Sequence, residues 1–265
     1  MMSKSLIEKH STSSPDENDA ILLFSEDSHE IYWLGIPEHT AFRSNTYLIK
    51  SGDEGIIVDP GHRAYFSRVF ERVRKIMDPS QISGLILCHQ DPDVAASMTD
   101  WLNINPDLKI ISSPRTHILL PYYNDGEYTH YDVVEQTVYR FSSGHEIEFI
   151  EAPFLHFAGA FVSFDRTSQF LLSGDIWGAI QMDWQLVVND FEEHQTYLDM
   201  FHIDYMASNI ACKGFVEKIR PLSPKALLPQ HGSIIGGNNV KAALDYLDQL
   251  QCGTDIAYPH LSISS

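Results

Sequence analysis

Residues 84–94 read Gly-Leu-Ile-Leu-Cys-His-Gln-Asp-Pro-Asp-Val, and this stretch decides the fold and the chemistry that we expect. The apolar run from Gly84 to Cys88 is short and has polar neighbours, which is typical of a buried strand. A helix is predicted to begin after Asp93. The turn between them therefore places one imidazole and two carboxylates, at positions 89, 91 and 93, directly after a strand.

The spacing of His89, Asp91 and Asp93 indicates a metal site. Side chains two positions apart in a tight turn can converge on one side of the chain. Two carboxylates crowded together repel each other unless a cation lies between them. A divalent metal ion would supply that charge. The alternative is an ordinary helix N-terminus, in which Asp93 caps the helix that begins at Val94.

Three further predicted strands end in side chains that bind metals. The alternatives are a core histidine at His156, a turn aspartate at Asp175 and a loop histidine at His231. These separate explanations do not account for four strand ends that all carry metal-binding side chains. We therefore predict a single metal centre built from His89, Asp91, Asp93, His156, Asp175 and His231.

The remaining pattern predicts a layered α/β or α+β domain in which helices cover the sheets. Residues 1–20 are polar and rich in serine, and we expect a flexible N-terminal arm followed by a single domain over 21–265. Strands are predicted over 21–24, 31–34, 45–50, 56–60, 84–88, 109–112, 146–151, 161–164, 169–172 and 226–229, and helices over 64–77, 94–101, 192–220 and 240–251.

Composition excludes several classes of protein. The 265 residues include 18 Lys and Arg against 36 Asp and Glu, a formal net charge of −18. A chain this acidic repels nucleic-acid phosphates and anionic membrane surfaces, so we expect neither as a partner. The three cysteines form no Cys-x-x-Cys pair, and no run approaches about 18 apolar residues. We therefore expect a cytoplasmic protein without a disulfide framework.

The order of the motifs resembles the metallo-β-lactamase superfamily, whose motif His-x-His-x-Asp-His precedes a later His, a bridging Asp after Gly, and a final His. The chain is most similar to the diiron domain of flavodiiron proteins and to stand-alone oxygen-binding diiron proteins, which carry His-x-Glu-x-Asp. Residues 205–210 (Tyr-Met-Ala-Ser-Asn-Ile) and 228–232 (Leu-Pro-Gln-His-Gly) also resemble the flavodiiron pattern. The resemblance implies a four-layer αββα sandwich.

The resemblance also implies a ligand set, with two departures. Asp91 is one methylene shorter than the Glu of the family pattern, and Val94 stands where many members have a further His. An aliphatic side chain cannot coordinate, so the second metal should keep an open position for water, oxygen or a substrate. By this resemblance, His89, Asp91 and His156 hold one metal, Asp93 and His231 hold the other, and Asp175 bridges them.

The donor set suggests which metal is bound. Imidazole and carboxylate without thiolate suit iron or manganese better than a histidine-rich set, which zinc favours. We expect two iron ions, with zinc or manganese as alternatives. We also expect Asp59, Cys88 and His194 to lie around the ligands.

These features favour a non-haem diiron protein that binds or reduces dioxygen. About 34 residues follow His231, too few for a flavin domain, so we expect no FMN domain in this chain. A separate electron donor or a signalling partner is then needed, and we favour an oxygen or redox sensor. The alternative is a dinuclear hydrolase whose bridging hydroxide attacks an ester, thioester or phosphodiester. The six intact donors argue against a scaffold protein with a decayed site. A homodimer is a further possibility that the sequence leaves open.

Overall fold

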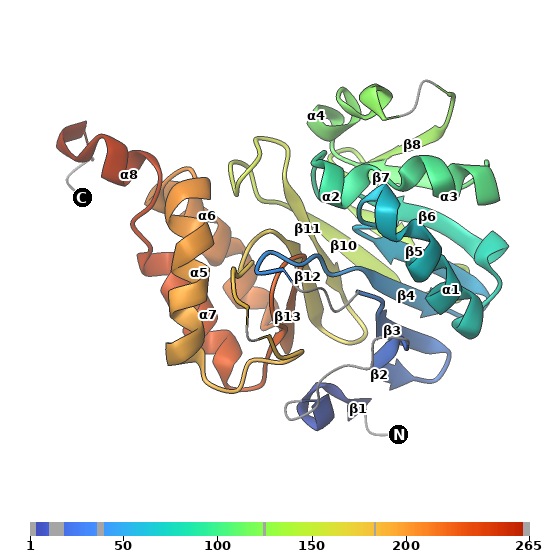
Figure 1. Cartoon of the computed structure of the whole chain (residues 1–265), viewed down its shortest axis with the longest axis horizontal. Coiled ribbons are helices and arrows are strands. Elements are labelled where there is room, and N and C mark those ends of the chain that lie inside the picture. Colours follow the sequence, from blue (N-terminus) through green and yellow to red (C-terminus); the bar gives the residue numbers. More distant parts are fainter. Residues whose placement is uncertain (1–3, 11–18, 36–39, 124–125, 183, 262–265) are drawn as a thin grey trace.

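Two stacked β-sheets organise the chain, and helices cover their outer faces (Figure 1). The computed structural model describes residues 4–10, 19–35, 40–123, 126–182 and 184–261. In the first sheet the strands run antiparallel as far as the fifth and parallel from there on. Its order is β1 (Lys4–Ser5), β2 (Ile21–Glu26), β3 (His29–Trp33), β4 (Tyr47–Ser51), β5 (Glu54–Val58), β6 (Ile82–Ile86), β7 (Lys109–Ser112) and β8 (Thr129–Asp132).

The second sheet comes from the later part of the chain. Neighbouring strands in this sheet are antiparallel, except for β12 and β13, which are parallel. The order is β14 (Ile235–Gly236), β13 (Ala226–Pro229), β12 (Phe170–Gly174), β11 (Phe161–Asp165), β10 (Glu146–Glu151) and β9 (Val138–Arg140).

Each sheet carries its own helical layer. The early helices α1, α2 and α3 pack on the first sheet, and α5, α6 and α7 pack on the second. Among the described residues, none of the helices is both long and apolar enough to span a membrane. The helices are α1 (Phe66–Ile76), α2 (Pro92–Ala95), α3 (Met98–Ile104), α4 (Pro114–His117), α5 (Phe191–Tyr205), α6 (Asn209–Ile219), α7 (Asn239–Gln249) and α8 (Thr254–Ala257), and the 3₁₀ turns are η1 (Ile7–His10), η2 (Arg63–Tyr65), η3 (Pro79–Gln81), η4 (Leu120–Tyr122), η5 (Arg220–Leu222) and η6 (Pro259–Leu261).

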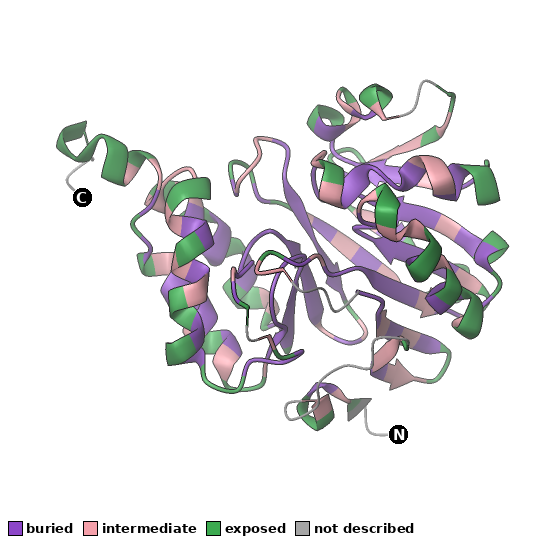
Figure 2. Cartoon of the chain, viewed as in Figure 1, coloured by how far each residue is buried: buried purple, intermediate pink, exposed green. Residues whose placement is uncertain are grey.

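The central strands are buried on both faces. In β12, Phe170 and Leu172 pack between the sheets, whereas Leu171 packs against the helices of the second sheet. In β5, Ile56 faces the space between the sheets and Ile57 faces the helices of the first. Neighbouring strand residues point to opposite faces, so a strand between two layers must be apolar throughout. Figure 2 shows these buried strands at the centre of the molecule. The predicted four-layer αββα sandwich is confirmed.

Most predicted elements lie where the structure has them, but the helix predicted over 94–101 is divided into α2 and α3, and that predicted over 192–220 is divided into α5 and α6. Residues 4–10 do not form the expected flexible arm, because Lys4–Ser5 pairs with β2 and Ile7 is buried. Gly236 makes room for Ile7, since a Cβ there would lie 3.0 Å from the Ile7 side chain. Residues 1–3 and 11–18 lie outside the described part of the chain. The short strands β8, β9 and β14 were not predicted.

A buried polar cluster joins the two sheets. His29 Nε2 of β3 lies 2.9 Å from Asp165 Oδ1 of β11, and both side chains are fully buried. The other Asp165 oxygen accepts hydrogen bonds from the backbone N–H and the hydroxyl of Ser168, at 2.7 and 2.5 Å. Ser51 Oγ lies 3.3 Å from His29 Nδ1. One carboxylate therefore satisfies buried donors from both sheets.

We predict that Asp165→Ala lowers the free energy of unfolding by about 2–4 kcal/mol, because His29 and Ser168 lose a buried acceptor. Urea unfolding followed by circular dichroism measures this change. The matched control is Glu71→Ala, which removes an exposed ion pair with Arg74 and should change the free energy by about 0.5 kcal/mol or less. Equal losses in the two variants would contradict the role of the cluster.

Candidate metal centre

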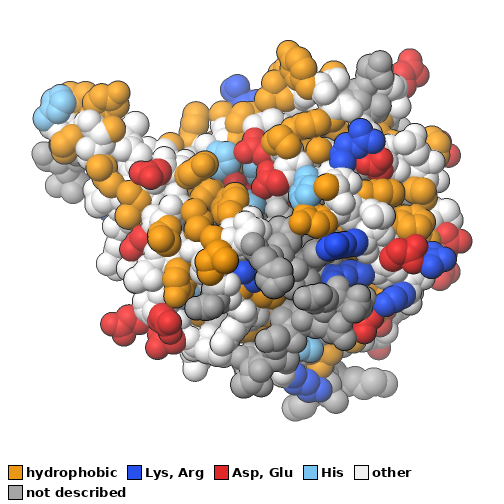
Figure 3. All heavy atoms as spheres, viewed as in Figure 1, with side chains coloured by type: hydrophobic (Ala, Val, Ile, Leu, Met, Phe, Trp, Pro, Cys, Tyr) orange, Lys and Arg blue, Asp and Glu red, His pale blue; other side chains and the backbone are white. Residues whose placement is uncertain are grey.

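The six predicted ligand side chains come together where strands of both sheets end. Strand β6 belongs to the first sheet, and β10, β12 and β13 belong to the second, so the centre lies between them. Figure 3 shows acidic and histidine side chains gathered between apolar ones on the viewed face. The six are His89, Asp91 and Asp93 after β6, His156 after β10, Asp175 after β12, and His231 after β13.

Asp175 lies at the middle of the cluster. Its Oδ2 is 2.8 Å from His156 Nε2 and 3.4 Å from His89 Nε2. Its Oδ1 faces the opposite way and is 3.5 Å from His231 Nε2. A carboxylate with its two oxygens directed at two separate imidazole sets has the geometry of a bridging ligand.

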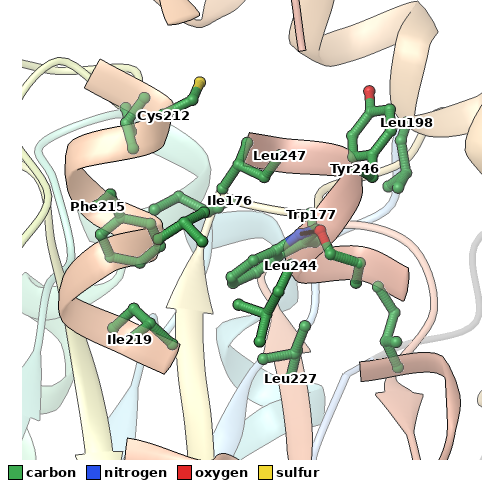
Figure 4. Close-up of a cluster of buried hydrophobic side chains, with 14 of the residues drawn as sticks. Ile176, Trp177, Leu198, Cys212, Phe215, Ile219, Leu227, Leu244, Tyr246 and Leu247 are labelled. Carbon is green, nitrogen blue, oxygen red and sulfur yellow. Dashed lines mark hydrogen bonds between the residues drawn. The ribbon is translucent and has the colours of Figure 1, made fainter. Parts of the chain in front are cut away.

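The turn that presents Asp175 is fixed by the helical layer. Gly174 has a φ of +56°, in the left-handed region that favours glycine. Two residues after Asp175, the Trp177 N–H donates to His202 Nε2 at 2.8 Å, and the indole N–H donates to the Ala243 carbonyl at 2.9 Å. Figure 4 shows Trp177 inside the helical layer of the second sheet. The packing of α5 and α7 therefore sets the direction of the bridge.

One half of the centre is formed by His89, His156 and Asp91. Asp91 Oδ2 lies 3.6 Å from His89 Nε2 and 3.7 Å from His156 Nε2. The Gln90 amide donates to the other Asp91 oxygen at 2.8 Å, which directs Oδ2 toward the histidines. The shorter Asp91 side chain therefore faces the same point as the two imidazoles.

The other half is formed by His231 and Asp93. His231 Nε2 lies 3.1 Å from Asp93 Oδ2. On the far side of the ring, Nδ1 is 3.1 Å from the Arg43 carbonyl. A carbonyl only accepts, so Nδ1 carries the hydrogen and Nε2 is left free to bind a metal. Val94 is fully buried in an apolar cluster and offers this half no donor.

The charges of the cluster balance one another. Burial raises the pKa of Asp175, but His89, His156 and His231 outweigh it and hold that pKa well below its usual range. Burial lowers the pKa of His89, and the carboxylates of Asp175 and Asp91 outweigh it and raise the pKa to about 9. Without metal, a proton on an imidazole provides the positive charge that the carboxylates need.

These residues fit a pair of metal ions. Asp175 Oδ1 is buried and accepts no hydrogen bond from any residue that the structure describes. A buried carboxylate oxygen in that position is costly unless it has a partner. A cation held by Asp93 and His231 would provide that partner. Three Nε2 atoms and three carboxylates, without a thiolate, are hard or borderline donors suited to iron, manganese or zinc.

Two of the three residues expected around the ligands lie there. The Cys88 N–H donates to Asp59 Oδ1 at 3.0 Å, and Cys88 Sγ lies 3.0 Å from His89 Nδ1. Burial raises the pKa of Asp59 to about 6. His194 was placed wrongly, because its ring packs instead against Phe191 and Tyr197 within α5.

Sequence reasoning missed residues that support the ligands. Gln230 donates through Nε2 toward Asp93 Oδ2 at 3.4 Å, as Gln90 does to Asp91. Both glutamines adjoin a predicted ligand in the sequence, and that adjacency was the available signal.

An aromatic wall was also missed. The Phe42 ring stacks on His231 with centroids 3.6 Å apart, and Tyr205 meets His156 edge-on at 5.6 Å. Phe201 stacks on Tyr205 with centroids 4.5 Å apart and completes the wall. It shields the imidazoles from water on one side.

Comparison with known proteins places these features in a family. The profile described as "ODP family beta lactamase" matches residues 42–232. A solved structure of the peroxy diiron species of the chemotaxis sensor ODP is 31% identical, with a TM-score of 0.80, and the alignment covers 91% of this chain and 100% of that one. The flavodiiron protein from Giardia intestinalis is 16% identical with a TM-score of 0.76, over 83% of this chain and 57% of that one, and shares the fold.

The chain is also similar in sequence to a longer flavoprotein. The putative diflavin flavoprotein A 1 of Nostoc sp. strain PCC 7120 is 26% identical over 225 residues, which is 83% of this chain. The chain spans 38% of the length of that relative.

We predict that His89→Ala lowers metal affinity by more than the roughly 10–100-fold that is typical of changes around the ligands. Elemental analysis after dialysis measures the metal that is retained. His194→Ala is the matched control, since it removes a buried imidazole outside the cluster and should keep the wild-type metal content. Equal retention in both variants would refute the ligand assignment.

Metal binding to the metal-free protein at pH 8 should release about one proton from His89, because a pKa of about 9 keeps that imidazole protonated until a metal displaces the proton. The raised pKa stabilises the metal-free fold fully below the unfolded value of about 6.5, and this stability is lost as the pH rises through 9. A pH indicator in weak buffer counts the released protons. His89→Ala should release about one proton fewer for each metal ion that it binds, and an unchanged count per bound metal would contradict the assignment.

Proposed function

The chain belongs to the ODP family beta lactamases, and from this membership and the geometry of the centre we propose that it is a non-haem diiron protein that binds dioxygen. His89, Asp91 and His156 hold one iron, Asp93 and His231 hold the other, and Asp175 bridges them. We further propose that oxygen binding serves as an oxygen or redox signal. Supporting this, a solved structure that is 31% identical over 91% of this chain is described as a chemotaxis sensor.

The observation that carries the proposal is the unequal ligand set of the two halves. Besides the shared Asp175, the half around His89 has three protein donors, and the half around His231 has two. The buried Val94 side chain offers the second half nothing further. A small ligand can therefore bind there without displacing a protein side chain.

The protein residues control how such a ligand would reach the centre. Phe42 and Tyr205 cover the imidazoles of His231 and His156, while the Asp91 and Asp93 side chains stay partly exposed. These carboxylates repel anions and leave a small uncharged molecule unaffected. Gln230 holds the Asp93 carboxylate in place beside the open position. When bound, a reduced pair of irons supplies the electrons that dioxygen binding requires.

A full catalytic cycle needs electrons from outside the centre. The chain spans well under two thirds of the curated flavoprotein relative, so the activity of that longer protein is not carried over whole. We propose a separate electron donor for any reduction of dioxygen, and a signalling protein as the partner in sensing.

We predict that protein produced in iron-rich medium binds about two irons per chain and gains a visible charge-transfer band when the reduced form meets air. The band should disappear on re-reduction. Asp175→Asn is expected to lose both irons together, because the bridge contributes to both halves.

A test for hydrolysis separates this proposal from the alternative, a dinuclear hydrolase. The zinc-loaded protein is tested on an ester, a thioester and a phosphodiester. Turnover of any of these, together with an iron-loaded form whose spectrum ignores air, would overturn the proposal in favour of a dinuclear hydrolase.

A further inference from the structure

Two of the three cysteines face each other outside the metal centre. Cys212 lies in α6, and Cys252 lies between α7 and α8. Their sulfurs are 3.9 Å apart, although 40 residues separate them in the sequence. Both side chains are fully buried and neither forms a disulfide. Figure 4 shows Cys212 at the edge of the helical layer.

The two thiols are chemically unequal. The neighbouring Cys252 sulfur, together with burial, raises the pKa of Cys212. Donation by Cys212 in turn lowers the pKa of Cys252. Cys252 is therefore the sulfur that more readily becomes a thiolate, the nucleophilic form.

The backbone holds Cys252 close to α6. The N–H of Gly253 donates to the Ile203 carbonyl, and the N–H of Thr254 donates to the Ala207 carbonyl, both at 2.9 Å. These two bonds hold the backbone next to Cys252 against the end of α5 and the connection from α5 to α6. With the backbone held there, the sulfurs can approach each other by adjustment of their side chains. A disulfide requires an S–S distance of about 2.05 Å.

The segment beyond Cys252 gives an oxidant a way in. Helix α8 and the turn η6 project from the body of the molecule and contain no buried residue (Figure 1). They present Ile256, Tyr258 and Leu261 to solvent. Local opening of this segment breaks the hydrogen bonds of Gly253, Thr254 and Asp255 but exposes little apolar surface, and it would uncover the Cys252 sulfur.

We propose that Cys212 and Cys252 form a site of reversible oxidation, at which hydrogen peroxide converts the dithiol to a disulfide that fixes residues 253–261 to α6. The Cys252 thiolate attacks one peroxide oxygen, the O–O bond breaks, and hydroxide leaves. The Cys212 sulfur then attacks the sulfenic sulfur of Cys252, and the Cys212 proton joins the departing oxygen, which leaves as water. The proton that Cys252 released when it became a thiolate neutralises the hydroxide. Two thiols and one peroxide give one disulfide and two waters.

The test counts thiols in the full chain. Protein loaded with zinc, which is inert to peroxide, is treated with hydrogen peroxide, denatured and titrated with a thiol reagent. The count should fall from three to one and return to three with dithiothreitol, and peptide mapping should find the Cys212–Cys252 link. A count that stays at three, or a link that involves Cys88, would overturn the proposal.

Variants separate the pair from the third cysteine. Cys88→Ala should lose both remaining thiols on oxidation, whereas Cys252→Ser should keep both of its thiols. Mapping of the wild-type protein decides the question even if a variant folds poorly.

Hydrogen exchange tests whether the disulfide fixes the segment. Oxidation should slow amide exchange over residues 254–261 at least about tenfold in the wild type and leave Cys252→Ser unchanged. Unchanged exchange in an oxidised wild type would refute the structural part of the proposal.

Discussion

The buried Asp175 carboxylate is the constraint on which the rest of the structure depends. One oxygen faces the imidazoles of His89 and His156, and the other faces His231. A carboxylate in this position is tolerable only when positive charge surrounds it, as protonated imidazole or as bound cations. Four strand ends from two sheets must therefore converge to within a few ångströms. The sandwich brings together ligands that lie up to 142 residues apart in the sequence.

Buried hydrogen bonds between the two halves of the sandwich fix the positions of these strand ends. The Asn45 side-chain amide donates to the carbonyls of Pro229 and Gly232, both at 2.9 Å, and its oxygen accepts from the Trp33 indole at 2.8 Å. One asparagine beside the first sheet thus binds the backbone before and after His231. On the opposite side, Asp59 holds the backbone of Cys88 and so the start of the ligand turn. These polar contacts are buried, and each would be costly to leave unmade.

The sequence located the six candidate ligands because the strands before them carry clear local patterns that survive folding: β6, β12 and β13 are apolar runs, and β10 alternates Glu with apolar residues. It could not predict distances between loops, so the stacking of Phe42 on His231 and the true surroundings of His194 came only from the structure. The short outer strands β8 and β9 contain polar, partly exposed residues and lack the apolar run of a central strand. Ile7 was missed because the short apolar pair Leu6-Ile7, set in a polar segment, carries no periodic signal.

The charge of the donor set supports the proposed oxygen binding over the alternative of hydrolysis. Three carboxylates, those of Asp91, Asp93 and Asp175, face the two proposed cations, so they offset three of the four positive charges that two divalent ions bring. With a histidine at position 91, the two remaining carboxylates would offset only two of the four positive charges. Greater negative charge stabilises the oxidised state of a metal and weakens its action as a Lewis acid, since the attraction for electrons falls as ligand charge accumulates. The carboxylate at position 91 therefore supports the proposed oxygen-binding centre over the alternative of a centre that polarises an ester.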